Sequence, residues 1–259
     1  MDWLEALALG VVQGLTEFLP VSSSGHLEIA KHLFGVDPES SFTMTVVLHG
    51  ATVLSTVVVF WQEILQLFKG FFKFKMNEET KYIFKIIISM IPVGIVGVFF
   101  KDKIEEFFNG NMVFIGSMLL VTAILLASAH FIRKRDRQIG YLDAFIIGIA
   151  QAFATIPGIS RSGATICTGL LIGNDKDSLA KFSFLMVLIP IIGANLLELV
   201  SGKMGAGGAT PVSSLIIGFI AAFISGYMAC RWMIALVKKS KLIWFALYCC
   251  IIGIVAMFL

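Results

Sequence analysis

Two short segments of this chain gather hydroxyl, ionisable and glycine residues within otherwise apolar sequence. The first runs from Gln13 to His26 and reads QGLTEFLPVSSSGH, and the second runs from Pro157 to Thr165 and reads PGISRSGAT. Serines followed by glycine before an apolar run favour the start of a helix. The free N–H groups and the positive dipole end of such a start bind phosphate. The residue types therefore predict two loops that share a phosphate-bearing ligand.

The two segments belong to a repeat with an offset of 138 residues (148 − 10). Five residues of the first copy recur in the second: Gly10, Gln13, Ser22, Ser24 and Gly25 correspond to Gly148, Gln151, Ser160, Ser162 and Gly163. The chemistry differs at three other positions: Ser23, Glu17 and His26 correspond to Arg161, Thr155 and Ala164. The first copy thus supplies a hydroxyl, an acid and an imidazole, and the second supplies a cation.

The first segment has the groups needed for nucleophilic attack and proton transfer. His26 lies three positions after Ser23 and four after Ser22, so a helix that begins there places the imidazole beside a hydroxyl. Histidine is the side chain best suited to proton transfer near neutral pH. Glu17 is expected either to orient His26 or to bind a divalent cation that bridges phosphate oxygens. Gln13, one helical turn before Glu17, joins the same network.

Arg161 is the expected phosphate ligand of the second segment, because a guanidinium binds phosphate through a fixed bidentate fork. An arginine at membrane depth costs about 2.5 kcal/mol or more unless it meets an anion or water. Structural interpretations remain open: Ser22 or Ser24 as a simple helix cap, Arg161 as a snorkelling cation, and His26 as a hydrogen-bonded core residue. Two further histidines are expected to be structural or interfacial, because the sequence offers them no partner: His49 and His130.

The composition places these segments in a membrane. Hydrophobic residues make up 58% of the chain and charged residues 14%, and the mean hydropathy is +0.91. Such a chain cannot cover itself with polar surface in water, so we predict an all-α polytopic membrane protein surrounded by bilayer lipids. The formal charge is only +3 and its cations are clustered, which argues against nucleic-acid binding. The four cysteines lie in apolar segments without metal-ligand spacing and are expected to be buried thiols.

The apolar segments differ in length. Those at about 4–19 and 24–35 are shorter than the roughly 20 residues that a transmembrane helix needs, and the same holds on either side of the break at 158–163. We therefore predict two re-entrant hairpins whose breaks line a cavity, since irregular backbone at membrane depth needs protein or water around it. The longer apolar segments lie at 42–66, 82–100, 112–132, 179–200, 212–236 and 241–259. Together with the hairpins they make up a single integral membrane domain with two repeats, at about 1–135 and 139–259.

Clusters of basic residues orient the segments. Cytoplasmic loops of membrane proteins are enriched in lysine and arginine, and three clusters qualify: Lys69, Lys73, Lys75, Lys81 and Lys85; Arg133, Lys134, Arg135 and Arg137; and Lys238, Lys239 and Lys241. The loops 101–111 and 202–211 lack such a bias and are expected outside. Both chain ends are then outside, the first hairpin opens outward and the second inward, so the repeats are inverted. Paired broken helices in inverted repeats indicate a site near the middle of the membrane.

The segment from Gly10 to His26, together with PGISRSGAT, resembles the bacitracin-resistance family of undecaprenyl-diphosphate phosphatases, and the likeness covers the whole chain. It implies an enzyme of the bacterial cytoplasmic membrane that removes the terminal phosphate of the C55 isoprenyl diphosphate carrier lipid. It also implies a divalent cation (Mg²⁺ or Ca²⁺) and a site open to the outer face. The matching functional residues are Glu17, Ser23, His26 and Arg161, with phosphate neighbours at Ser22, Ser24, Gly25, Ser160, Ser162, Gly163 and Thr165.

One position departs from the family pattern. Many members have a glutamate where this chain has Gln13, so a metal site made from Glu17 and Gln13 has one carboxylate instead of two. The expected reaction is attack by Ser23 with His26 as base, or direct attack by water with Ser23 binding phosphate. The alternative function is a lipid-phosphate flippase, which the inverted repeats also fit. Three glycines could support helix packing within one chain or in a homodimer: Gly94, Gly97 and Gly218.

Overall fold

The structure is a computed structural model that describes residues 1–36, 38–100, 103–104, 106–108, 110–132, 137–200, 210–238 and 242–259. Over these residues the chain forms eleven α-helices and one short 3₁₀ helix, η1 (Glu106–Phe108), and its only extended pairing is the isolated bridge between Arg137 and Asn174. The all-helical fold expected from the composition is thus confirmed. Several residues used to orient the chain lie outside the described residues: Arg133, Lys134, Arg135, Lys239, Lys241 and parts of the loops 101–111 and 202–211.

The first hairpin consists of α1 (Trp3–Phe18) and α2 (Ser23–Phe34). A capping box between Asp2 and Glu5 starts α1. The helix ends where Leu19 becomes extended, because the residue before a proline is driven out of the helical region. Ser22 then caps α2 by accepting a hydrogen bond from the Gly25 N–H, and it does so at a φ of 71°, a conformation that non-glycine residues rarely adopt.

The second hairpin consists of α8 (Tyr141–Phe153) and α9 (Arg161–Leu171). Ser160 caps α9 through the Gly163 N–H, as Ser22 caps α2. In the connecting loop Gly158 has a φ of 93°, and a Cβ there would lie 2.8 Å from the Ile115 carbonyl oxygen. Both facts require glycine at this position. The two breaks predicted from Pro20 and Gly158 are therefore present, each followed by a serine-capped helix.

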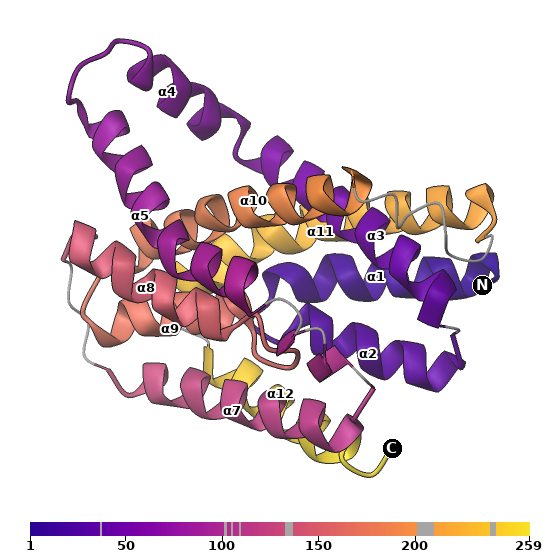
Figure 1. Cartoon of the computed structure of the whole chain (residues 1–259). Helices are drawn as coiled ribbons and strands as arrows, with labels where there is room; N and C mark the ends of the chain where they lie inside the picture. Colours follow the sequence, from indigo (N-terminus) through magenta and orange to yellow (C-terminus); the bar gives the residue numbers. More distant parts are fainter. Residues whose placement is uncertain are drawn as a thin grey trace.

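The remaining helices follow the predicted segments with one difference. They are α3 (Pro38–Val59), α4 (Trp61–Phe71), α5 (Glu78–Phe99), α7 (Met112–His130), α10 (Lys176–Val200), α11 (Val212–Lys238) and α12 (Leu242–Ala256). The segment expected to run unbroken over 42–66 is instead divided at Phe60, which leaves the helical region, and α4 continues beyond it, away from the bundle (Figure 1). Among the described residues, four helices are long and apolar enough to cross a membrane by length and composition: Phe42–Val59, Glu78–Phe99, Met112–His130 and Val212–Leu236.

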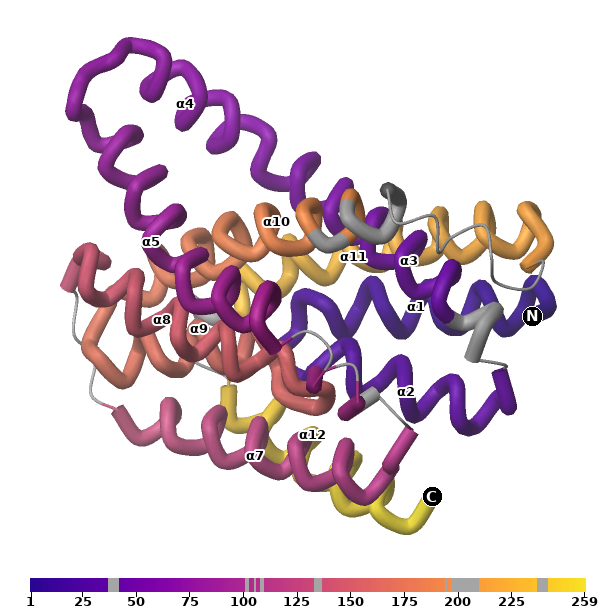
Figure 2. The backbone as a smooth tube through the Cα atoms, in the orientation of Figure 1, coloured from indigo at the N-terminus to yellow at the C-terminus, as the bar shows by residue number. Residues whose placement is uncertain are grey.

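The two halves of the chain repeat in element order and exchange partners. The helices α1, α2 and α3 begin at residues 3, 23 and 38, and α8, α9 and α10 begin at 141, 161 and 176, each 138 positions later (141 − 3). The helix α1 packs along α11 of the second half, and α8 packs along α5 of the first. Figure 2 shows α1 and α2 extending toward the N-terminal end of the molecule and α8 and α9 toward the opposite end. The loops of both hairpins therefore meet in the interior.

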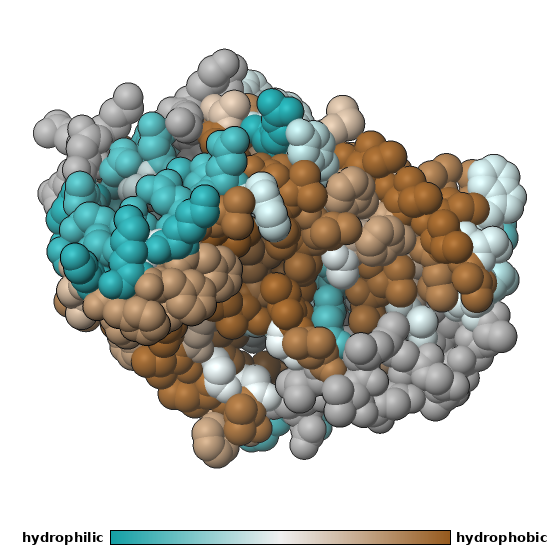
Figure 3. Space-filling model, turned by 90° about the horizontal axis from the view of Figure 1, so that it is seen from above, coloured by the Kyte–Doolittle hydropathy of each residue, from teal (hydrophilic) through white to brown (hydrophobic). Residues whose placement is uncertain are grey.

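The outer surface of the bundle is apolar. Exposed side chains recur at every fourth position along α11, at Ile216, Ile220, Ile224 and Met228. A soluble helix would place polar residues there. Figure 3 shows this apolar surface over most of one face, with hydrophilic residues gathered at the end where α4 and α5 meet. Such a distribution suits a helix bundle surrounded by lipid.

Candidate active site

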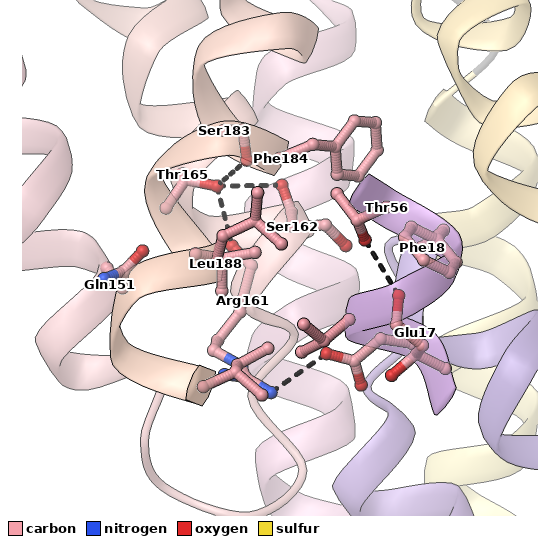
Figure 4. A pocket seen from close by; sticks show the side chains of 14 residues that line it. Glu17, Phe18, Thr56, Gln151, Arg161, Ser162, Thr165, Ser183, Phe184 and Leu188 are labelled. Atoms are coloured by element: carbon pink, nitrogen blue, oxygen red, sulfur yellow. Dashed lines mark hydrogen bonds and ion pairs between the residues drawn. The ribbon is translucent and has the colours of Figure 1, made fainter. Parts of the chain in front are cut away.

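The tips of the two hairpins are in direct contact. Arg161 donates from Nη2 to Glu17 Oε1 at 3.0 Å, an ion pair that joins residues 144 positions apart (Figure 4). Ser162 Oγ donates to the Leu19 carbonyl oxygen at 3.2 Å, and a Cβ on Gly25 would lie 3.2 Å from Gly158 Cα. The acid of one loop and the cation of the other thus form one site, as the divided chemistry of the two copies suggested.

Glu17 is the centre of this site. Its side chain is 8% exposed and both carboxylate oxygens are engaged. Besides the Arg161 contact at Oε1, Oε2 accepts hydrogen bonds from Ser23 Oγ at 2.5 Å and from Gln13 Nε2 at 3.0 Å. The Glu17 carboxylate therefore holds the Ser23 hydroxyl in a position from which Glu17 can receive the serine proton.

His26 is placed differently from the expectation. Its Nδ1 contacts the Ser22 carbonyl oxygen at 2.8 Å, and its Nε2 contacts Tyr248 Oη at 2.9 Å, with the two rings stacked at 5.5 Å between centroids. A carbonyl oxygen only accepts, so Nδ1 carries the hydrogen and Nε2 accepts from Tyr248. No hydrogen bond joins His26 to Glu17, and the expectation that Glu17 orients His26 is replaced by the direct contact of Glu17 with Ser23.

His49 belongs to the site, although the sequence offered it no partner. Its Nε2 lies 4.0 Å from Glu17 Oε2, and its Nδ1 contacts the Thr45 carbonyl oxygen at 2.9 Å. One signal could have found it. At the repeat offset His49 corresponds to Val187, so it is an ionisable residue in an apolar span whose counterpart is apolar. Ionisable residues within membrane spans are usually functional. Tyr248 gave no comparable signal, because its contact with His26 joins residues 222 positions apart in the chain.

The remaining expected residues cluster at the two helix starts. Ser22 Oγ and Ser24 Oγ lie 3.3 Å apart at the start of α2, and Ser160 Oγ and Ser162 Oγ lie 3.3 Å apart at the start of α9. The glycines that follow them donate their N–H groups to the caps: Gly25 to Ser22 and Gly163 to Ser160. One turn into α9, Thr165 Oγ1 donates to the Arg161 carbonyl oxygen at 2.8 Å, and it also contacts Ser183 Oγ of α10.

A small cavity of about 20 Å³ lies beside these loops, lined by residues of α1, α3, α8, α9 and α10. Its polar lining comes from Glu17, Thr52, Thr56, Gln151, Arg161, Ser162, Thr165 and Ser183. Its apolar lining comes from Phe18, Val53, Phe184, Val187, Leu188 and Ile191. Polar and apolar side chains thus border the same space beside the hairpin tips.

The donor set for a divalent cation is sparse. Across the described part of the chain, no three His, Cys, Asp or Glu side chains are gathered as a metal site would require. Glu17 is the acidic side chain at the hairpin tips, and Gln13 Oε1 beside it is a buried oxygen without a hydrogen-bond partner. Oxygen donors suit Mg²⁺ and Ca²⁺. These two residues fit a cation whose other ligands come from the substrate.

Comparison with known proteins agrees with the chemistry of the site. The family model described as bacitracin resistance protein BacA matches residues 6–255. A relative from Parabacteroides distasonis, named undecaprenyl-diphosphatase, is 57% identical over 98% of this chain and 97% of its own length. Proteins of the same name from Bacteroides fragilis and Christiangramia forsetii are 56% and 54% identical, over 98% and 99% of this chain and 97% of each relative. The chain belongs to the bacitracin resistance protein BacA family.

Proposed function

We propose that the protein is an undecaprenyl-diphosphatase. It removes the terminal phosphate of the C55 isoprenyl diphosphate carrier lipid and leaves the monophosphate, which returns to cell-wall synthesis and thereby counters bacitracin. One observation carries the proposal beyond family membership: Glu17 and Ser23 of one hairpin meet Arg161 of the other. A nucleophile, a proton acceptor and a phosphate-binding cation thus converge on one point.

Arg161 and the two helix starts bind the diphosphate. The guanidinium uses one N–H on Glu17, and its other N–H groups are available for phosphate oxygens. Ser22 and Ser160 occupy the Gly25 and Gly163 N–H groups, which leaves other first-turn N–H groups of α2 and α9 to bind phosphate oxygens. These fixed donors stabilise the charge that develops on the phosphoryl group as it is transferred, which is where most of the catalysis of phosphoryl transfer resides.

Ser23 is the nucleophile. Its oxygen forms a bond to the terminal phosphorus, its proton passes to Glu17 Oε2, and the bond from that phosphorus to the bridging oxygen breaks. The bridging oxygen and its electron pair leave with the prenyl monophosphate. Water then cleaves the phosphoserine and releases phosphate. His26 as the proton acceptor stays a prediction, and that role requires Tyr248 to release Nε2 first.

A divalent cation, Mg²⁺ or Ca²⁺, accompanies the diphosphate. We propose that Glu17 and Gln13 hold it and that phosphate oxygens supply its remaining ligands. Its chemistry there is to neutralise phosphate charge. Because Gln13 is neutral, the site has one carboxylate to balance both Arg161 and the cation. We therefore expect weaker metal binding than in relatives with a glutamate at this position.

The membrane is the bacterial cytoplasmic membrane, and the site faces its outer side. Support comes from the basic residues Lys69, Lys73, Lys75, Lys81 and Lys85, which surround the turn between α4 and α5 and favour the cytoplasm for that end. The first hairpin and the N-terminus lie toward the opposite end (Figure 1). The prenyl chain of the substrate remains in the bilayer while the head group enters between the hairpins.

The deciding experiment measures phosphate release by the purified protein in detergent from C55 diphosphate with Mg²⁺, with Ca²⁺ or with EDTA. We expect metal-dependent release, which Ser23→Ala abolishes and which rapid quenching traps as phosphorylated Ser23. Full activity of Ser23→Ala would exclude the covalent route. Movement of the lipid between leaflets without phosphate release would instead identify a flippase.

A further inference from the structure

The pocket has a second polar end that the proposed chemistry at Glu17 does not use. Gln151 of α8 lines the pocket and is 1% exposed, yet neither its amide nitrogen nor its amide oxygen has a hydrogen-bond partner among the described residues. Buried amides are nearly always hydrogen-bonded, because leaving them unpaired is costly. Figure 4 shows Gln151 and Glu17 on opposite sides of the pocket with Arg161 between them.

The repeat shows what kind of partner Gln151 lacks. Its counterpart Gln13 donates its amide hydrogen to a carboxylate, that of Glu17, four positions later. Four positions after Gln151 the chain has Thr155, which carries no charge and donates its hydroxyl to the Ala152 carbonyl oxygen. The second glutamine has thus kept the donor of the first without its anionic acceptor. An anionic oxygen brought by a ligand would replace it.

The surroundings of Gln151 favour an anion. Arg161 is the nearest charged residue of the pocket lining on this side, and its guanidinium has N–H groups beyond the one given to Glu17. The other charged lining residue, Glu17, lies across the pocket. The hydroxyls of Thr165 and Ser183 extend the polar surface. Beyond Ser183 the wall of α10 turns apolar, at Val187, Leu188 and Ile191.

We propose that Gln151, together with Arg161, binds the prenyl-bearing phosphate of the substrate, the one that leaves with the lipid. This rests on the proposed function. In phosphoryl transfer the nucleophile and the leaving oxygen lie roughly in line on opposite sides of the phosphorus. With Ser23 on the Glu17 side of Arg161, the leaving phosphate lies on the Gln151 side. The first isoprene units then follow the apolar residues of α10 toward the bilayer.

The test uses farnesyl diphosphate as a soluble substrate, and farnesyl monophosphate and inorganic phosphate as competing ligands. Gln151→Met keeps the shape of the side chain and removes both polar atoms. We expect kcat/KM to fall about tenfold or more, as the loss of hydrogen bonds to a charged group predicts. Affinity for farnesyl monophosphate, measured by calorimetry without turnover, should fall by a similar factor. Affinity for inorganic phosphate should not change.

The matched control is Tyr82→Phe in α5, which removes another buried polar atom without a described partner, outside the pocket lining. Its kinetics and affinities should equal those of the wild type. Gln151→Glu places a carboxylate opposite the phosphate. It should therefore lower the affinity for farnesyl monophosphate more than Gln151→Met does. Melting temperatures of all variants establish that they are folded.

Three results would overturn the assignment. Wild-type kinetics and affinities in Gln151→Met would mean that the amide is satisfied by water. If Gln151→Met lowers the affinity for inorganic phosphate and leaves the affinity for farnesyl monophosphate unchanged, this end of the pocket binds the released phosphate instead. Slower turnover with both affinities unchanged would leave Gln151 a purely structural role. If the wild type binds farnesyl monophosphate in a Gln151-dependent way but releases no phosphate, the proposed function fails and the binding site stands.

Discussion

At the scale of single residues, one carboxylate connects the two halves of the molecule. Glu17 accepts hydrogen bonds from Ser23 and Gln13 of its own hairpin and from Arg161 of the other. A buried carboxylate needs such compensation, and so does a guanidinium at membrane depth. Each charge therefore stabilises the other before substrate arrives, and the diphosphate must share Arg161 with Glu17.

Arg161→Lys tests this shared guanidinium. Lysine keeps the charge and can still pair with Glu17, but it cannot contact the carboxylate and a phosphate through a planar fork. We expect kcat/KM for farnesyl diphosphate to fall roughly a hundredfold, the equivalent of about 3 kcal/mol. The control is Arg231→Lys in α11, whose guanidinium contacts Tyr227 and lies outside the pocket lining. Unchanged kinetics of Arg161→Lys would remove this residue from the proposed site.

The sequence predicted which loops carry the site but not all of its contacts. Glu17, Ser23 and Arg161 could be selected because each departs from its repeat counterpart in a segment otherwise shared. Tyr248 could not be selected, and His49 could be selected only as an ionisable residue with an apolar repeat counterpart, because their contacts with Glu17 and His26 depend on how α3 and α12 pack. The rotation of a helix about its axis and the choice of rotamer depend on tertiary contacts that spacing along the chain does not encode.

At the scale of helices, small residues allow the hairpins to pack closely on the longer helices. On α1, a Cβ added to Gly10 would lie 2.5 Å from the Gly218 carbonyl oxygen of α11, and one added to Gly14 would lie 2.6 Å from that of Ala222. In the second half, Gly148 of α8 meets the Ser89 backbone of α5 in the same way. Without these approaches the loops would not reach the centre of the molecule.

Gly14→Ala is expected to destabilise the protein. The added methyl group meets backbone on α11, which cannot move aside as a flexible side chain can, and overpacking of this kind costs about 1–3 kcal/mol. The melting temperature in detergent should therefore fall. The control is Gly97→Ala in α5, where a Cβ meets no atom within 4 Å. Because alanine favours helices more than glycine does, Gly97→Ala should leave the melting temperature unchanged or raise it.

The same pair of variants bears on the homodimer that the sequence left open. Gly218 packs within the chain, against α1 and α3, whereas Gly94 and Gly97 face open space in the monomer. A lower melting temperature of Gly97→Ala, or a change in its size on a sizing column, would indicate that α5 packs against a second copy. An unchanged melting temperature of Gly14→Ala would contradict the close packing of α1 on α11.

At the scale of the whole molecule, the two hairpins extend in opposite directions from a common centre (Figure 1). The element order could be predicted, because hydropathy, serine-glycine breaks and the 138-residue offset all recur along the chain. The break at Phe60 could not, because no proline or glycine marks it. The orientation of the bundle in the membrane is predicted separately, from the distribution of lysine and arginine alone.

Labelling of single cysteines tests that orientation. The native residues Cys167, Cys230, Cys249 and Cys250 are first replaced by alanine, and one cysteine is then introduced at an exposed position. In the variant His32→Cys, near the end of α2, the cysteine should react with an impermeant maleimide in spheroplasts, because the first hairpin is predicted to open outward. Cysteines introduced by Phe74→Cys, in the turn after α4 where Phe74 is 85% exposed, and by Leu142→Cys, at the start of α8, should react only after permeabilisation. The basic residues around that turn favour the cytoplasm.

The comparison of His32 with Leu142 carries the most information, because the two positions mark the open ends of the two hairpins. Reaction of both from the same side would mean that the hairpins enter from one face. A single diphosphate could then not lie between a Ser23 reached from outside and an Arg161 held from inside. Reaction of His32 and Phe74 in the reverse order would instead invert the whole protein, keep the site intact and place hydrolysis at the cytoplasmic face. Only the predicted order lets the enzyme act on lipid at the outer surface, where the bundle presents the open end of its first hairpin.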